Sequence, residues 1–121
     1  MYSPLVLEHF QNPRNSGVAG NANAVARVQN PVCGDVLELS LRVEGRTIAE
    51  VRFLAQGCVP TIACASRLTE MVQGSALKEA LAVDRESLIE SLAGLPQESY
   101  HAAQLSIEAL HSALREFRDG G

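Results

Sequence analysis

Two stretches of alternating apolar and polar residues, followed by a change to helical spacing, restrict the fold of this chain most strongly. Residues 36–43 alternate cleanly, and residues 47–55 do so again after the tight turn Glu44-Gly45-Arg46. A period of two predicts strands with one buried face, so this region should form an antiparallel hairpin. We expect Ile48 to point outward, and the inward face to consist of small or aliphatic residues and one Phe: Leu37, Leu39, Leu41, Val43, Ala49, Val51, Phe53 and Ala55.

Helical signals flank this hairpin on both sides. Ser3 and Pro4 begin a predicted helix over residues 4–11, and Pro60 lies in the first turn of another that Gly74 closes. Residues 12–23 are predicted to be a surface loop and residues 24–29 a strand. Three further helices are expected at 76–81 after a Ser75 cap, at 85–93 after an Asp84 cap, and at 98–118 with the inward stripe Ala103, Ile107, Leu110, Leu114 and Phe117.

This order of elements predicts an α+β fold, a three-stranded antiparallel sheet with helices packed on one side. The 121 residues suit a single domain over positions 1–121.

Composition excludes several classes of function. With a net charge of −4, the chain lacks the basic character of a protein that binds duplex nucleic acid. No secretory signal or membrane span is visible, so we expect a cytoplasmic protein. Three cysteines in such a chain favour metal ligands, reactive thiols or small core residues over disulfides.

Three loops carry the candidate functional residues. Cys33-Gly34-Asp35 precedes one hairpin strand, Gly57-Cys58 follows its antiparallel partner, and His101 lies near the start of the last helix. The hairpin places the first two loops at the same end of the sheet. Thiolate, carboxylate and imidazole groups gathered there would suit zinc or iron. Cys58 also precedes a helix, whose amino terminus favours a thiolate.

Each of these residues also has a plainer interpretation. Cys33 and Cys58 could be small buried residues, and Asp35 could be a turn residue. His101 falls nearly opposite the apolar stripe of its helix, so it either meets the site or lies in solvent. Cys64 is expected to be a buried, inert thiol, with a supplementary ligand as the alternative. His9 and His111 are expected to be surface residues.

Several motifs in this order give the chain a resemblance to the IscU-type scaffolds of iron–sulfur cluster assembly, equivalent to the amino-terminal domain of NifU. The similarity covers nearly the whole length. It is carried by Tyr2-Ser3, His9-Phe10-Gln11-Asn12-Pro13-Arg14-Asn15, Asn30-Pro31-Val32-Cys33-Gly34-Asp35-Val36, Phe53-Leu54-Ala55-Gln56-Gly57-Cys58, and Leu95-Pro96 followed by His101. The resemblance implies an IscU/SufE-like fold.

The resemblance also implies a function and a ligand set. Scaffolds of this kind hold a nascent [2Fe–2S] cluster, iron or zinc, receive sulfur as persulfide from a cysteine desulfurase, and pass the cluster to apo acceptor proteins. Mapped onto this chain, the implied ligands are Cys33, Asp35, Cys58 and His101, with Asp35 keeping the cluster labile. The family resemblance predicts a scaffold and not an enzyme, with zinc as the isolated form. The acidic charge and the lack of a long apolar run predict no nucleic-acid or membrane partner.

The chain departs from the family pattern at three places. The third family cysteine, directly after the histidine, is Ala102 here, which leaves four implied ligands and raises the question of whether Cys64 compensates. The chaperone-recognition segment Leu-Pro-Pro-Val-Lys is Leu95-Pro96-Gln97-Glu98-Ser99, which argues against docking to the specialised chaperone. Val59-Pro60 stiffens a loop that family members usually build from small residues.

Alternative functions remain open at the level of sequence. One is a zinc-bound sulfur-transfer partner of a cysteine desulfurase, resembling the SufU branch, although such members usually keep the third cysteine and carry an insertion. Another is a divergent member without cluster function, suggested by Ala102. A cysteine-nucleophile hydrolase would pair Cys58 with His101, but no orienting third group or oxyanion motif is evident.

Overall fold

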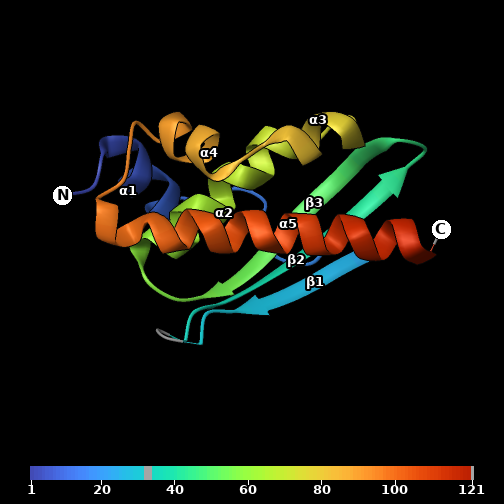
Figure 1. Cartoon of the computed structure of the whole chain (residues 1–121), viewed down its shortest axis with the longest axis horizontal. Helices are drawn as coiled ribbons and strands as arrows, with labels where there is room; N and C mark the ends of the chain where they lie inside the picture. The colour runs from blue at the N-terminus through green and yellow to red at the C-terminus, as the bar shows by residue number, and fades with distance from the viewer. Residues whose placement is uncertain (32–33, 121) are drawn as a thin grey trace.

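The computed structural model describes residues 1–31 and 34–120, and it places a sheet on one side and helices on the other (Figure 1). Strands β1, β2 and β3 form one antiparallel sheet in that order, which confirms the predicted α+β class. The elements are α1 (Pro4–Gln11), β1 (Ala24–Gln29), β2 (Val36–Glu44), β3 (Thr47–Gln56), α2 (Val59–Val72), α3 (Leu77–Ala82), α4 (Arg85–Ser91), the 3₁₀ turn η1 (Gln97–Ser99) and α5 (Tyr100–Gly120).

The β2–β3 hairpin has the predicted inward face, with one correction. The four inward residues of β2, together with Val51 and Phe53 of β3, are buried. Ile48 is also fully buried, so the prediction that it points outward was wrong. A bulge causes the change: Arg42 pairs with Glu50, but the next residue of β2 pairs with Ile48. The extra residue in β3 reverses the alternation and turns Ile48 into the core.

The predicted loop over residues 12–23 protects one edge of the sheet. Phe53 in the edge strand β3 donates its N–H to the Asn15 carbonyl at 2.9 Å and accepts from the Gly17 N–H at 2.8 Å. On β2, the Ser40 hydroxyl accepts from the Ala19 N–H at 2.8 Å. The two bonds to Phe53 satisfy backbone groups of the edge strand that would otherwise invite another strand to pair.

Helices α2 and α5 lie directly on the sheet, α2 mainly on β3 and α5 on β1 and β2. The predicted stripe of α5 is buried except for Phe117, which is half-buried. The predicted caps Ser3 and Asp84 are confirmed, since each side chain accepts a backbone N–H of its helix. Ser75 is not a cap, because its hydroxyl donates to the Val72 carbonyl and α3 begins after Ala76.

Helix α1 packs on α2 through a buried histidine, which corrects the prediction of a surface residue. His9 is only 5% exposed, and its Nδ1 lies 2.7 Å from the Ser66 hydroxyl of α2. Its Nε2 lies 3.2 Å from the Glu70 carboxylate. The polar partners come from a helix 57 residues away in sequence, so the sequence of α1 alone does not reveal them. His111, also predicted at the surface, is half-buried.

No helix in the described part of the chain is long and apolar enough to cross a membrane.

Candidate metal centre

The hairpin register places Asp35 beside Gly57. The first residue of β2, Val36, pairs with Gln56, the last residue of β3. Asp35 therefore precedes one strand at the point where Gly57 follows the other. The turn before β2 is closed by two backbone hydrogen bonds of Asn30, whose N–H donates to the Asp35 carbonyl and whose carbonyl accepts from Gly34, both at 2.8 Å. Gly34 has a φ of +78°, a conformation that favours glycine.

Gly57 allows the Asp35 carboxylate to lie directly against the backbone of the second loop. A Cβ atom at position 57 would stand 2.8 Å from Asp35 Cγ and about as close to both carboxylate oxygens, at 3.0 and 3.1 Å. Such distances are too short for a side chain at position 57 without a shift. The requirement for glycine is therefore steric, because the φ of Gly57 is not positive.

The Asp35 carboxylate is buried and contacts a hydroxyl of α2 and the thiol that immediately precedes this helix. Its Oδ2 accepts a hydrogen bond of 2.5 Å from the Thr61 hydroxyl and lies 3.6 Å from Cys58 Sγ, while the residue is 7% exposed. Among the described residues, no lysine or arginine forms an ion pair with it. Buried carboxylates normally have a cationic partner or bind a metal ion. Asp35 therefore has the environment of a cation ligand.

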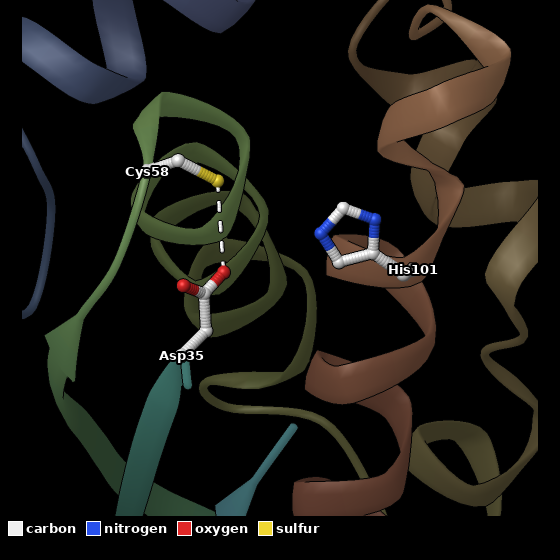
Figure 2. Close-up of side chains that lie close together, drawn as sticks. All are labelled: Asp35, Cys58 and His101. Carbon is white, nitrogen blue, oxygen red and sulfur yellow. Dashed lines mark hydrogen bonds between the residues drawn. The ribbon is translucent and has the colours of Figure 1, made fainter. Parts of the chain in front are cut away.

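Cys58 and His101 approach Asp35 from two different helices. Cys58 is the residue immediately before α2 and is exposed, and His101 projects from the first turn of α5 toward it (Figure 2). One ligand atom each from Asp35, Cys58 and His101 lies within 4.8 Å of the other two. The structure thus brings together three of the four predicted residues.

The histidine ring has the orientation and tautomer that metal binding requires. His101 Nδ1 lies 3.0 Å from the Glu98 carbonyl. A carbonyl only accepts, so Nδ1 carries a proton, and in the neutral ring the lone pair is then on Nε2. Figure 2 shows the Nε2 side of the ring facing Asp35 and Cys58. Metal-bound histidines commonly donate their other ring N–H to a carbonyl or carboxylate in this way.

The donor set fits a metal ion such as iron or zinc. Ligand atoms about 2.0–2.3 Å from one ion lie roughly 3–4 Å apart, so the observed grouping would need only a small contraction. One thiolate, one imidazole and one carboxylate form a mixed sulfur, nitrogen and oxygen set. The fourth predicted ligand, Cys33, lies outside the described residues, so its place in the site stays a prediction.

Neither Ala102 nor Cys64 adds a ligand to this centre. Ala102 is fully buried beside His101 and has no donor atom. Cys64 is fully buried in α2, as expected, and burial together with the nearby Cys58 raises the pKa of its thiol to about 12. A thiol in this state is neutral, and only the thiolate is a good metal ligand. Compensation by Cys64 would require the first turns of α2 to unwind.

Thr61 is the polar residue of the site that sequence reasoning missed. It is the third residue of α2 and is 1% exposed. A side chain at this position of a helix can reach back to the residue that precedes the helix. Here the Thr61 hydroxyl lies 3.4 Å from Cys58 Sγ while it donates to Asp35. That helical position was the available signal, but nothing in the local pattern indicates that Asp35 lies on the other side of the hydroxyl.

Comparisons with known proteins agree with this architecture. The family model described as "NifU-like N terminal domain" matches residues 1–120. An iron-sulfur cluster assembly scaffold protein IscU from Archaeoglobus fulgidus is 41% identical over 100% of this chain and 80% of its own length. The IscU scaffold protein from Aquifex aeolicus is 42% identical over 96% of this chain and 75% of its own length.

Solved structures show the same fold at lower sequence identity. The crystal structure of a NifU-like amino-terminal protein from Brucella abortus has a TM-score of 0.79 at 17% identity and covers 98% of this chain and 95% of its own. A scaffold protein described as putative for the SUF system of Fervidobacterium islandicum has a TM-score of 0.73 at 22% identity and covers 93% and 96%. Sequence and structure together show that this chain belongs to the family of NifU-like amino-terminal domains.

Proposed function

We propose that this protein is an iron–sulfur cluster assembly scaffold that binds iron or a transient [2Fe–2S] cluster as cargo and passes it to acceptor proteins. The observation that carries the proposal is the grouping of Cys58 and His101 around the carboxylate of Asp35. This carboxylate is buried and has no cationic partner among the described residues. Membership of a family whose curated relatives are named cluster assembly scaffolds supports it.

In this proposal Cys33, Asp35, Cys58 and His101 hold the cargo. The exposure of Cys58 and His101 supports release, since an acceptor's ligands can reach the cargo from solvent. Transfer then proceeds by ligand exchange, in which an incoming thiolate replaces a scaffold ligand. A cysteine desulfurase supplies the sulfur, apo iron–sulfur proteins accept the cluster, and the protein acts in the cytoplasm as a scaffold without an enzymatic activity of its own.

Asp35 is proposed as the weakest ligand of the set, because a carboxylate is a harder ligand than a thiolate. Asp35→Ala should therefore slow transfer of a reconstituted cluster to an apo acceptor. The loss of the cluster's absorption from the scaffold measures this rate. An unchanged transfer rate would count against this role for Asp35.

Anaerobic purification followed by elemental analysis tests the proposal most directly. We expect iron or zinc in the protein, and visible charge-transfer absorption after addition of iron and sulfide. Cys58→Ser should abolish that absorption, whereas the matched variant Cys64→Ser, at a buried thiol outside the donor group, should retain it.

Two other outcomes would replace the proposal. Retention of zinc without cluster formation, with a persulfide on a thiol after incubation with a desulfurase and cysteine, would indicate a sulfur-transfer partner. The absence of metal from the native protein and of any cluster after reconstitution would indicate a divergent interaction module.

A further inference from the structure

Thr61 forms the most direct described link between the Asp35 carboxylate and helix α2. Its hydroxyl donates to Asp35 Oδ2 at 2.5 Å, and this same oxygen lies 3.6 Å from Cys58 Sγ. Gly57 holds the other side of the carboxylate against the backbone. The carboxylate is thus fixed between one side chain and one stretch of main chain, with Oδ2 directed toward the thiol.

The Thr61 hydroxyl has one proton and two neighbouring acceptors. In the structure the proton is donated to Asp35 Oδ2, and the second neighbour, Cys58 Sγ, lies 3.4 Å from Thr61 Oγ1. The hydroxyl therefore lies between the carboxylate and the thiol, within reach of both groups.

We propose that Thr61 is a positioning residue of the metal centre: its hydroxyl orients the Asp35 carboxylate toward the cargo. This inference rests on the proposed function and deepens it. Thr61 binds no cargo itself, and it acts only through Asp35. Groups that hold a ligand in place commonly contribute 10–100-fold to metal affinity.

Binding of Co²⁺ to the full chain tests this assignment, because Co²⁺ reports both affinity and ligand set through its visible d–d bands. Thr61→Val removes the hydroxyl and keeps the shape of the side chain. We expect about a tenfold loss of Co²⁺ affinity and altered d–d bands, with the sulfur-to-cobalt charge-transfer band preserved. Thr61→Ser retains the hydroxyl and should bind within about twofold of the wild type.

A double-mutant cycle separates positioning from a general effect on the fold. If Thr61 acts through Asp35, Thr61→Val should change Co²⁺ affinity by less than twofold in an Asp35→Ala background. Thr69→Val is the matched control, since Thr69 is a buried threonine of the same helix whose hydroxyl donates to the Ser66 carbonyl at 2.6 Å. It should leave Co²⁺ binding unchanged. Thr61→Ala, which removes the same hydroxyl, replaces Thr61→Val if that variant does not fold.

The failure of this inference and the failure of the proposed function give different results. Two results would overturn the role of Thr61 alone while the wild type still binds Co²⁺. In the first, Thr61→Val binds Co²⁺ as tightly as the wild type. In the second, Thr61→Val lowers Co²⁺ affinity equally in the wild-type and Asp35→Ala backgrounds. Wild-type protein that binds neither Co²⁺ nor a cluster would overturn both. A loss confined to the Asp35-containing background, with rescue by Thr61→Ser, supports the inference.

Discussion

Helix α2 contributes to two buried polar clusters whose charges are balanced differently. At its start, Thr61 bonds the Asp35 carboxylate, which has no basic ion-pair partner among the described residues. Two turns later, Ser66 and Glu70 surround His9 of α1, and Arg14 and Arg67 lie within 4 Å of Glu70. We call the second group the α1–α2 cluster.

The difference separates a binding site from a structural contact. In the α1–α2 cluster the Glu70 carboxylate has His9 and two arginines as partners, so its charge is balanced inside the protein and the group holds two helices together. At the start of α2 the Asp35 carboxylate has no lysine or arginine partner within the described part of the chain, and a metal ion would supply the positive charge. Burial alone therefore does not identify the functional cluster, whereas the missing charge does.

The largest expected effect is the loss of metal binding in Cys58→Ala. Removal of a thiolate ligand should lower affinity for Co²⁺ or Zn²⁺ by at least about 100-fold, above the range for residues that only position a ligand. His9→Gln, in the α1–α2 cluster, should leave the affinity unchanged. Equal losses from both variants, measured by metal titration, would show that the two clusters do not differ in function.

Gly57→Ala should be the next largest change. The new Cβ would stand 2.8 Å from Asp35 Cγ, so the carboxylate must move, at a cost of about 1–3 kcal/mol in the free energy of unfolding. Metal affinity should fall as well. Gly20→Ala is the matched control, since nothing lies within 4 Å of its added Cβ and it should be near neutral. Denaturant unfolding of the two variants gives the comparison, and equal stabilities would contradict the steric argument.

The α1–α2 cluster should make stability depend on pH. Burial lowers the pKa of His9 below 6.5, with Arg14 and Arg67 acting in the same direction and Glu70 and Glu8 opposing. Below pH 6.5 the unfolded chain binds a proton that the folded chain resists, so stability falls as the pH drops from 6.5 toward the lowered pKa.

Unfolding at several pH values tests this contribution, with His9→Gln as the variant that cannot titrate. The slope of unfolding free energy between pH 7.5 and pH 5.5 should be smaller in His9→Gln than in the wild type. His111→Gln serves as the control at a histidine that is only half-buried. An identical slope in the wild type and His9→Gln would show that His9 does not carry the effect.

The smallest expected effect belongs to the partly exposed ion pair at the rim of the α1–α2 cluster. Arg67 lies 3.0 Å from the Glu70 carboxylate, and both side chains are 32% exposed. Arg67→Gln should change the free energy of unfolding by about 0.5 kcal/mol, because solvent screens such pairs. A change above about 2 kcal/mol in chemical denaturation would mean that this pair stabilises the fold as a buried contact does.

The sequence by itself determined the main helices and strands, and it determined that the loops containing Asp35 and Gly57 lie at the same end of the sheet. Alternation over residues 36–55 predicts the hairpin, and a hairpin places Asp35 and Gly57 at one end through its hydrogen-bond register alone. The position of His101, opposite the apolar stripe, predicted that it faces the site or solvent, and the helix start at Cys58 was likewise visible.

Only the tertiary structure decided the side-chain partners. The bulge that buries Ile48, the burial of His9 against Ser66, and the bond from Thr61 to Asp35 each join residues through packing between elements. Local sequence patterns encode which face of a helix or strand is apolar. They do not encode which polar group of a distant element lies against that face, because this depends on how the elements pack together.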